Sequence, residues 1–434
     1  MRELIEPDSI KSAASTAAFD MMTFYSGNQS GQIPGKLAGT WWEGGALFMT
    51  LIQYWYFTGD TTYNDEVSVG MQWQAGENAD YMPSNWSSYL GNDDQVFWGL
   101  AAMTAAELKY PDVPDKPSWL SLAQAVLNTQ AARWDTTACG GGLRWQLYPY
   151  QAGYTTKNSV SNGGFFQLAA RLAVYTGNTS YADLANKMWD WSKSVPLLNT
   201  QTWHVGDTTS MESNCTDLGN IQWTYNYGIY MMGAAYMYNF TDGGQEWADA
   251  VYGLLNVTLE TFFPDKYGGN IMSEVACEVN MKCDRNQDCF KGFLSLWFAF
   301  TTYLVPGTAD LIIPKLQGSA QGAASQCSGG GSGTFCGRRW WQKTWDGTQS
   351  LEEQLSTTSI FTATLVGKTG GPPVKASTGG TSKSDPGVGG GGSTNDQGST
   401  VLLKPITTGD KAGAGILTAL VLATILGTAF WLVK

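Results

Sequence analysis

Two adjacent acidic residues are the strongest candidates for chemistry in this sequence. The stretch "YLGNDDQVFWGLAAMTAAE", residues 89–107, holds the only two consecutive aspartates of the chain, Asp93 and Asp94. Asn92 is a good helix N-cap, which places both aspartates in the first turn of a helix that continues "QVFWGLAAMTAAEL". A structural interpretation exists, because an aspartate in the first turn complements the helix dipole. One aspartate would satisfy the dipole, however, and the second adds repulsion.

Two neighbouring carboxyl groups are what a glycosidase requires, one to protonate the departing oxygen and one to attack or stabilise the anomeric carbon. Adjacent residues, with Cα atoms about 3.8 Å apart, place their carboxyl groups roughly 5–7 Å apart. This separation fits a retaining enzyme better than an inverting one. The helix terminus favours ionisation of one aspartate, and that charge disfavours ionisation of its neighbour. The second aspartate can then keep a proton near neutral pH and serve as the acid.

Aromatic and polar residues gather in the loops that precede the presumed inner helices. Flat amphipathic rings serve as core and also as stacking platforms for sugars. Each of these residues alone occurs more often in a core than in a site, but their shared location favours a sugar cleft. They are Trp41 and Trp42 in "GTWWEGG", Arg144 and Trp145 in "LRWQ", and Tyr225, Asn226 and Tyr227 in "QWTYNYG".

Composition excludes several classes of function. The 434 residues are 43% hydrophobic and 14% charged, which describes a globular protein. The net charge of −12, without a cluster of Lys and Arg, argues against nucleic acid or anionic lipid as the main partner. A single histidine, His204, rules out a multi-histidine zinc site, and the lack of a GxSxG motif argues against a Ser-His-Asp triad. We interpret His204 as a loop or supporting residue and expect neither a metal site nor an obligatory cofactor.

The cysteines and sequons favour a secretory route. "CEVNMKCDRNQDC" has no C-x-x-C and no nearby histidine, so disulfides are favoured over a metal loop. Cys327 and Cys336 are expected to close a small loop, and the odd number of cysteines leaves at least one free thiol. The remaining pairings stay open among Cys139, Cys215, Cys277, Cys283 and Cys289. The expected glycosylation sites are Asn28, Asn85, Asn178, Asn214, Asn239 and Asn256.

The two ends of the sequence bear on localisation. "MRELIEPDSIKSAAS" lacks the apolar run of a leader, so this is a mature or truncated form or the secretory interpretation fails. Residues 362–400 are rich in Gly, Ser, Thr and Pro and are expected to be a disordered linker. Residues 401–434 read as a spacer and an apolar tail that ends one residue before the terminus, which favours a glycosylphosphatidylinositol (GPI) signal over a membrane span. We expect attachment between Asn395 and Ser399 and a location at the cell surface or in the cell wall.

Helical periodicity dominates residues 1–361, which we expect to form one catalytic domain. A repeat is visible: "GGALFMTLIQYWYFTGDTTYNDEV" from Gly44 matches "GGFFQLAARLAVYTGNTSYADLAN" from Gly163, each an apolar helix followed by a second helix, and a weaker copy starts at Asn226. Such helix pairs suit a closed toroid or a solenoid, and with about six pairs we expect an all-α (α/α)6-type barrel whose inner helices converge on a cleft at one end. The expected helices are 9–25, 43–57, 94–109, 119–132, 163–175, 180–192, 225–238, 245–262, 290–303 and 308–317.

The motifs "WWEGG", "YLGNDDQVFWGLAAMTAAE", "SNGGFFQLAARL", "TYNYG" and "CFKGF" resemble, in this order, those of glycoside hydrolase family 76, the endo-α-1,6-mannanases. With the sequons and the tail, the chain is most similar to the fungal cell-wall branch of the DFG/DCW type. The resemblance implies a barrel and a retaining mechanism, with Asp93 as nucleophile and Asp94 as general acid/base. It also implies substrate contacts by Trp41, Trp42, Asn162, Asp207, Asn226, Tyr227 and Lys291.

The resemblance further implies action on the mannose core of GPI anchors, with transfer of the protein to wall β-glucan. A covalent mannosyl-enzyme on Asp93 can be intercepted by a sugar hydroxyl if the acceptor side binds glycan and excludes water. We expect a monomer. The main alternative is a non-catalytic mannan-binding protein at the cell surface, and a third interpretation treats the aromatic residues as core.

Overall fold

The computed structural model describes residues 6–37, 40–217 and 219–389. Within these ranges the chain forms twelve α-helices, five short 3-10 helices and four short strands. The α-helices are α1 (Pro7–Met22), α2 (Trp42–Thr58), α3 (Asn64–Gln74), α4 (Asn92–Glu107), α5 (Trp119–Ala131), α6 (Ser159–Thr176), α7 (Thr179–Ser194), α8 (Thr224–Phe240), α9 (Gln245–Phe262), α10 (Phe290–Leu304), α11 (Ala309–Ser325) and α12 (Leu351–Ala363). The strands are β1 (Thr156–Asn158), β2 (Thr208–Ser210), β3 (Cys327–Gly329) and β4 (Phe335–Cys336).

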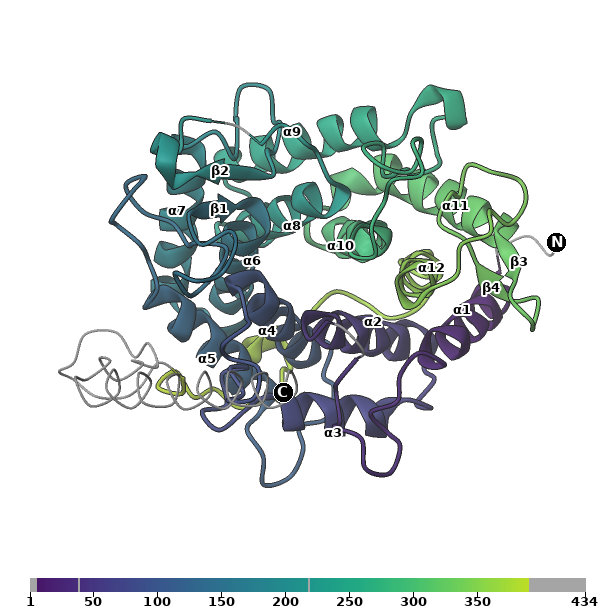
Figure 1. Ribbon diagram of the computed structural model, residues 1–434, viewed down its shortest axis with the longest axis horizontal. Coiled ribbons are helices and arrows are strands. Elements are labelled where there is room, and N and C mark those ends of the chain that lie inside the picture. Colours follow the sequence, from purple (N-terminus) through teal and green to yellow (C-terminus); the bar gives the residue numbers. More distant parts are fainter. Residues whose placement is uncertain (1–5, 38–39, 218, 390–434) are drawn as a thin grey trace, which may run out of the picture. The chain divides into compact units, whose positions relative to one another are not determined.

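The even-numbered helices form a closed inner ring. Helix α2 packs on α4, α4 on α6, α6 on α8, α8 on α10, α10 on α12, and α12 returns to α2. Each odd-numbered helix packs outside, with α1 on α12, α3 on α2, α5 on α4, α7 on α6, α9 on α8, and α11 on α12 and α10. Figure 1 shows this ring of helices, with α10 and α12 seen end-on. The predicted (α/α)6-type barrel is therefore confirmed.

Burial explains which helices lie inside. Nearly every residue of α6 is buried, and all of α12 is buried, whereas α7 and α9 each bury one face only. A helix that is covered on all sides needs no polar face, while an outer helix keeps one toward solvent. The polar composition of α12, "LEEQLSTTSIFTA", gave no apolar period, and this inner helix was missing from the prediction.

The Gly-Gly pair of the repeat lets inner helices approach closely. A Cβ on Gly45 would lie 2.9 Å from the backbone nitrogen of Trp98 in α4. A Cβ on Gly164 would lie 2.6 Å from a methyl group of Val96 in the same helix. Helices α2 and α6 thus both press their glycines against α4, so the repeated motif is a packing requirement of the ring.

The compact unit extends further than the expected boundary at residue 361. Helix α12 runs to Ala363, and the described residues of the unit continue to Gly389. The backbone nitrogen of Val374 donates to the carbonyl of Glu107 at 2.9 Å, and the backbone nitrogen of Asp385 donates to Gln124 Oε1 at 2.8 Å. Residues 364–389 therefore lie along α4 and α5 (yellow-green in Figure 1) as part of the barrel rather than as a disordered linker. The sequence did not predict this packing, because the segment has few apolar residues and is held by hydrogen bonds.

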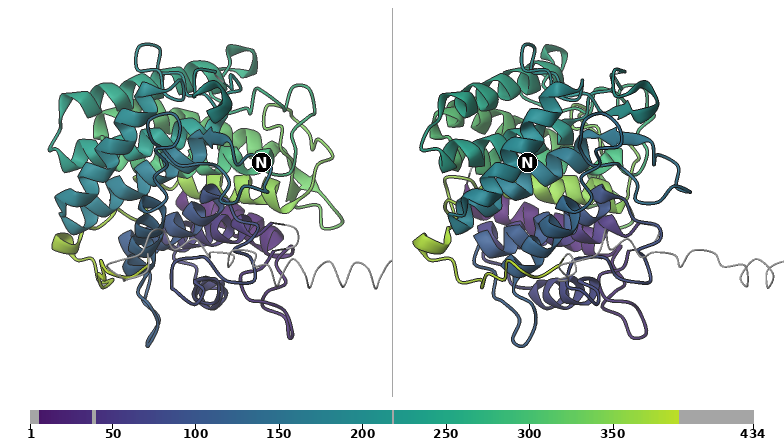
Figure 2. Two further views of the ribbon diagram at one scale, coloured as in Figure 1. Left: turned by 60° about the vertical axis from the view of Figure 1, so that its left-hand side comes forward. Right: turned by 90° about the vertical axis from the view of Figure 1, so that its left-hand side faces the viewer.

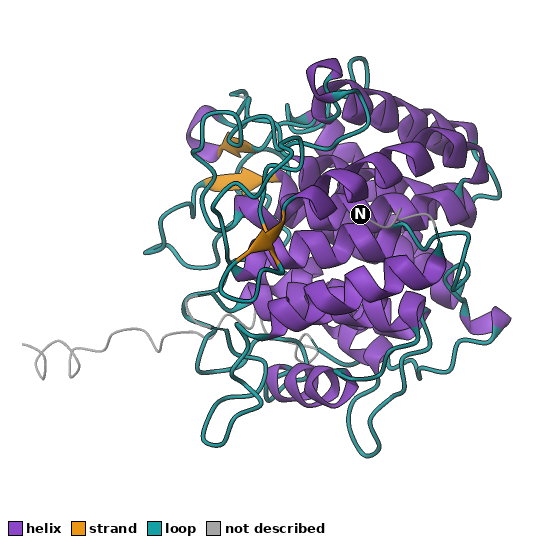
Figure 3. Ribbon diagram, turned by 90° about the vertical axis from the view of Figure 1, so that its right-hand side faces the viewer, coloured by secondary structure: helices purple, strands orange, loops and turns teal. Residues whose placement is uncertain are grey.

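The long loops and all four strands gather at one end of the helices, as Figure 3 shows, while Figure 2 shows the helices side by side from two other directions. Strands β1 and β2 pair antiparallel, as do β3 and β4. Among the described residues, no helix is long and apolar enough to span a membrane. The expected GPI attachment site and apolar tail lie outside the described residues.

A buried ion pair between two inner helices provides a test of the ring. Arg171 of α6 donates to both carboxylate oxygens of Glu107 in α4, with Nη2 at 2.6 Å from Oε2, and both side chains are almost fully buried. Arg171→Met should lower the free energy of unfolding by about 3–5 kcal/mol, because Glu107 is left as an unpaired buried charge. Urea denaturation measures this loss.

The matched control is Lys193→Ala, which removes a partly exposed lysine paired with Asp190 and Glu246. We expect this change to cost less than about 1 kcal/mol. The double variant Arg171→Met with Glu107→Leu should recover stability relative to Arg171→Met. A loss no larger than that of the control would contradict the role assigned to the buried pair.

Candidate active site

A cleft of about 440 Å³ opens where five inner helices begin. Its lining includes the first residues of α2, α4, α6, α8 and α10. The convergence expected from the repeat is therefore observed, and the positive ends of these helix dipoles meet at one place. The lining residues are Trp42, Asp93, Asp94, Phe97, Trp145, Gln146, Asn158, Val160, Asp207, Thr208, Ile221, Trp223, Tyr225, Asp284, Asn286, Gln287 and Phe290.

The first turn of α4 fixes the two aspartates. Gly91 is the N-cap, and its backbone nitrogen donates to Asp94 Oδ2 at 2.6 Å. The backbone nitrogen of Asp94 donates to Asp93 Oδ1 at 3.0 Å, and Asn158 Nδ2 lies 3.5 Å from Asp93 Oδ2. A Cβ at position 91 would lie 2.4 Å from Asp93 Oδ1, so only glycine leaves room for this carboxylate.

Asn92 is the first residue of α4 rather than its expected N-cap. Its side chain donates to the carbonyl of Arg144 at 2.8 Å, and its backbone nitrogen donates to the carbonyl of Trp145 at 2.9 Å. Arg133 Nη1 donates to Asn92 Oδ1 at 2.9 Å and to Gln95 Oε1 at 2.7 Å. The asparagine therefore joins the first turn of α4 to the loop that carries Trp145, a tertiary role that local sequence does not reveal.

Burial and mutual repulsion set the protonation of the pair. Burial and the charge of Asp94 raise the pKa of Asp93 well above its usual value. Burial raises the pKa of Asp94 to about 6, against the lowering effect of the Gly91 N–H. Two carboxyl groups this close titrate as one coupled system, so the pair holds a proton near neutral pH. The resemblance assigns the nucleophile role to Asp93 and the acid role to Asp94.

A third carboxyl group faces the cleft. Asp207 was a substrate-contact candidate, and it lines the cleft together with the aspartate pair. Burial raises the pKa of Asp207, while hydrogen bonds from Asn226 and Trp223 lower it. Asn226 Nδ2 donates to Asp207 Oδ1 at 3.0 Å. Asn226, itself a candidate, therefore orients Asp207 and does not line the cleft.

Of the remaining candidates, Trp42 lines the cleft with its ring against Phe97. The structure does not bring the other four to the cleft, because each is buried in a contact of its own. Trp41 Nε1 donates to Gln74 at 2.6 Å, and Asn162 binds the backbone of Leu143. The hydroxyl of Tyr227 donates to Gln222 at 2.7 Å, and Lys291 pairs with buried Glu278 at 2.5 Å. These side chains position the loops.

Sequence reasoning missed two groups that line the cleft. Asn158 ends β1 and caps α6, accepting from the backbone nitrogen of Ser161. Its position before a helix was the available signal. Asp284, Asn286 and Gln287 come from the cysteine-rich loop, which was interpreted only as a disulfide segment. Arg285 in that loop forms ion pairs with the buried carboxylates of Glu43 and Glu352, which fix the loop against α2 and α12.

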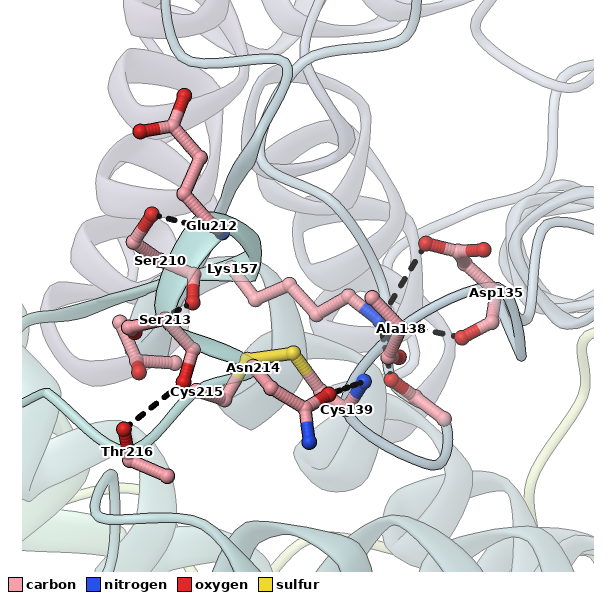
Figure 4. Close-up of a disulfide and its surroundings, with 12 residues drawn as sticks. Asp135, Ala138, Cys139, Lys157, Ser210, Glu212, Ser213, Asn214, Cys215 and Thr216 are labelled. Atoms are coloured by element: carbon pink, nitrogen blue, oxygen red, sulfur yellow. Dashed lines mark hydrogen bonds and ion pairs between the residues drawn. A yellow bond between two sulfur atoms is a disulfide. The ribbon is translucent and has the colours of Figure 1, made fainter.

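Disulfides hold the loops around the cleft. The predicted Cys327–Cys336 bond is present, and the open pairings resolve as Cys139–Cys215 and Cys277–Cys283, with Cys289 as a buried free thiol. Figure 4 shows the Cys139–Cys215 bond beside Lys157, which reaches from β1 to Asp135 and Ala138. This cross-link joins the loop after α5 to the segment after β2.

The predicted sequon asparagines lie at the surface of the barrel, five of them exposed and Asn239 partly buried. Asn214 also accepts a hydrogen bond from the backbone nitrogen of Cys139 at 3.0 Å (Figure 4). His204 is an exposed loop residue. Among the described residues, no group of three or more His, Cys, Asp or Glu side chains could hold a metal ion.

Comparison with known proteins identifies related sequences. The sequence profile of glycosyl hydrolase family 76 matches residues 9–377. Mannan endo-1,6-alpha-mannosidase DCW1 of Saccharomyces cerevisiae is 43% identical over 433 residues, which cover 98% of this chain and 93% of that protein. Mannan endo-1,6-alpha-mannosidase DFG5 of Candida albicans is 41% identical over 437 residues, covering 99% and 94%.

Two solved structures are also similar to this chain. The crystal structure of Dfg5 from Chaetomium thermophilum in complex with glucosamine has a TM-score of 0.85 and 43% identity, covering 89% of this chain and 97% of that one. An inactive variant of the α-1,6-mannanase GH76A of Salegentibacter sp., in complex with α-1,6-mannotriose, has a TM-score of 0.65 and 17% identity, covering 82% and 99%. The second likeness concerns the fold alone.

The raised pKa values of the aspartate pair predict how stability depends on pH. Because burial raises both pKa values above the unfolded value near 3.8, the folded state binds more protons, and stability falls as pH rises through the folded values. Replacing both aspartates with asparagine should therefore stabilise the protein near neutral pH, and the gain should vanish near pH 3.8. Urea denaturation across this range measures it.

Asp217→Asn serves as the control with the opposite sign. Hydrogen bonds from Ser213 and the backbone of Ser210 lower the pKa of Asp217, so its carboxylate contributes stability above its unfolded pKa that is lost as pH falls. Asp217→Asn should therefore lower stability near neutral pH. Equal pH profiles for the paired variant and the wild type would contradict the burial argument.

Proposed function

The chain belongs to glycosyl hydrolase family 76, and on that premise we propose that it is a retaining endo-α-1,6-mannosidase and transglycosylase. The observation that carries the proposal is the pair of adjacent carboxyl groups on the first turn of α4, facing an aromatic-walled cleft. The names of relatives that match nearly the whole chain support α-1,6-linked mannose as substrate.

The proposed reaction uses the two aspartates in different roles. Asp93 attacks the anomeric carbon and forms a covalent mannosyl-enzyme, while Asp94 donates its proton to the departing oxygen. Asp94 then removes the proton of the incoming hydroxyl, and the bond to Asp93 breaks. Asn158, near Asp93 Oδ2, and the N–H of Gly91, on Asp94 Oδ2, keep the two groups in place. The first step requires the ionised form of Asp93 and the protonated form of Asp94.

The choice of acceptor determines whether the reaction is hydrolysis or transfer. We infer that the donor is the mannose core of a GPI anchor and that a β-glucan hydroxyl is the acceptor, which would link the anchored protein to the cell wall. The sequons and the apolar tail of the sequence support a cell-surface, GPI-anchored location. The protein is proposed to act as a monomer and without a cofactor.

A non-catalytic mannan-binding protein is the second candidate. The aromatic cleft would serve such a protein equally well. Two crowded buried carboxyl groups would be of no use to it, because they cost stability without adding a neutral sugar contact. The aspartate pair therefore favours the enzyme.

The catalytic roles predict distinct losses. Asp93→Asn and Asp94→Asn should each lower kcat on an α-1,6-mannooligosaccharide by about 10³-fold or more, since each removes one step of the double displacement. Release of reducing ends measures turnover. Asp190→Asn, at a 69% exposed side chain on α7, is the control and should keep wild-type activity.

An activated aryl α-mannoside separates the two roles. Its leaving group needs no proton, so Asp94→Asn should still form the mannosyl-enzyme and release the aryl alcohol in a burst, whereas Asp93→Asn should not. Unchanged turnover in either variant would overturn the mechanism. Binding of mannan by both variants, together with a wild type that never turns over, would establish the binding protein instead.

Transfer predicts a product that hydrolysis cannot form. With an α-1,6-mannoside donor and a soluble β-glucan oligosaccharide, the wild type should form a mannosyl-glucan whose yield rises with acceptor concentration, because acceptor and water compete for one intermediate. Mass spectrometry detects the product. Free mannose oligosaccharides alone at every acceptor concentration would show a hydrolase and exclude β-glucan as acceptor.

A further inference from the structure

Three tyrosines lie beyond the cleft on the loops that flank the catalytic turn. The side chains of Tyr89 and Tyr150 are 73% and 62% exposed, which is unusual for rings of this size, and Tyr148 is half-buried. We call Tyr89, Tyr148 and Tyr150 the aromatic shelf. None of them lines the cleft, so the mechanism leaves them without a role.

The aromatic shelf is held in place by its own contacts. The rings of Tyr148 and Tyr150 are parallel within 1°, with centroids 5.4 Å apart. Gln151 Oε1 accepts from the backbone nitrogen of Tyr148 at 2.7 Å, and the hydroxyl of Tyr150 donates to the carbonyl of Ser88 at 2.9 Å. The last bond joins the two loops, so the exposed rings are presented on a fixed surface rather than on free loop ends.

The shelf is continuous with the cleft. Trp145 and Gln146 line the cleft, and Tyr148 and Tyr150 follow in the same loop after Leu147. Gln146 pairs with Gly91, the N-cap of α4, as an antiparallel bridge. Gln151 Nε2 donates to the carbonyl of Leu90 at 3.4 Å, which joins the same two loops a second time. A chain molecule that leaves the cleft past Trp145 would therefore meet the shelf.

The two segments that carry the shelf contain no charged residue of their own. Residues 84–92, "SNWSSYLGN", and 145–154, "WQLYPYQAGY", lack Asp, Glu, Lys and Arg. Two cations lie on other rings of these segments, Lys36 at 5.5 Å from the Trp86 ring and Arg144 at 4.1 Å from the Tyr154 ring. Exposed phenol rings suit a neutral, hydroxyl-rich chain, because sugar C–H groups pack on ring faces while the hydroxyls stay in water. A nucleic acid would instead require a cluster of cations.

We propose that the aromatic shelf is an outer glycan-binding subsite that holds mannose units of the α-1,6-mannan chain remote from the cleaved bond. The proposal rests on the endo-α-1,6-mannosidase activity in the proposed function and not on the GPI-core donor, since an endo-acting enzyme binds a chain that continues beyond its cleft. Binding energy from these remote units lowers KM for long chains and is not available to short ones.

Chain length tests the subsite. On α-1,6-mannohexaose, Tyr150→Ala should raise KM by about fivefold, the loss of one aromatic contact, with kcat unchanged. The double variant Tyr148→Ala with Tyr150→Ala should raise KM at least as much. On α-1,6-mannobiose the same variants should match the wild type. Tyr150→Phe keeps the ring and should retain most of the affinity for mannohexaose. Phe19→Ala removes a 64% exposed ring away from the cleft and should leave KM for both substrates unchanged.

Other results would overturn the proposal. Equal KM values of the shelf variants and the wild type on mannohexaose would show that the tyrosines bind no glycan. If the shelf variants bind a linear β-1,3-glucan oligosaccharide more weakly than the wild type but bind mannohexaose equally well, the shelf binds β-glucan rather than mannan. Melting temperatures equal to that of the wild type show that the variants are folded, and a folded variant that loses kcat equally on both substrates would place the effect at the aspartate pair.

Binding measurements separate this inference from the proposed function. In an Asp94→Asn background, calorimetry with mannohexaose reports affinity without turnover. If the wild type turns over neither mannoside but Tyr150→Ala still weakens mannohexaose binding in this background, the enzyme assignment fails and the subsite stands. If the wild type turns over both mannosides and Tyr150→Ala changes neither KM nor affinity, the enzyme stands and the subsite fails.

Discussion

The close approach of the inner helices is the constraint on which the rest of the structure depends. Glycines at the starts of α2 and α6 bring both helices against α4, and no larger side chain fits at these contacts. Helices packed this tightly into a ring must all begin at comparable levels if their preceding loops are to meet. The cleft follows from this geometry, since its lining is drawn from the beginnings of five inner helices. The repeated Gly-Gly motif, which carries no chemistry of its own, therefore determines where chemistry can occur.

A ring of buried helices must also satisfy its polar groups internally, and the structure does so with paired charges and amides. Arg171 with Glu107 joins α4 and α6, and Lys291 with Glu278 fixes the start of α10. Removal of one partner leaves a charge that water cannot reach. The same logic explains the buried contacts of Asn162 and Lys291, two of the four contact candidates that do not line the cleft. A charged or amide side chain at a helix start looks alike in sequence whether it faces a ligand or a neighbouring backbone.

Sequence patterns predicted most of the helices and the aspartate pair, because both depend on residues that are close in the chain. Apolar periodicity located the helices from α1 to α11, except α3, well enough to predict the barrel, and the consecutive aspartates at the start of α4 do line the cleft. Helix α12 was not predicted, because a helix buried by its neighbours can be rich in Ser and Thr. The hydroxyl of Ser356, for example, donates to the carbonyl of Asp288. The packing of residues 364–389 and the role of Asn92 were not predicted for a related reason, because long-range hydrogen bonds leave no periodic signal in the sequence.

The aspartate pair is subject to two opposing effects, burial and the hydrogen bonds of the helix N-terminus. The N–H of Gly91 donates to Asp94 Oδ2, and the N–H of Asp94 donates to Asp93 Oδ1. These hydrogen bonds oppose the burial that raises both pKa values, and the two groups titrate as one system. In the proposed mechanism, a sugar oxygen beside Asp94 selects the state in which Asp94 carries the proton, because a hydrogen bond to that oxygen requires a donor. The negative charge then lies on Asp93, where positive charge develops on the anomeric carbon. In this proposal the substrate assigns the roles of two groups that otherwise share one proton.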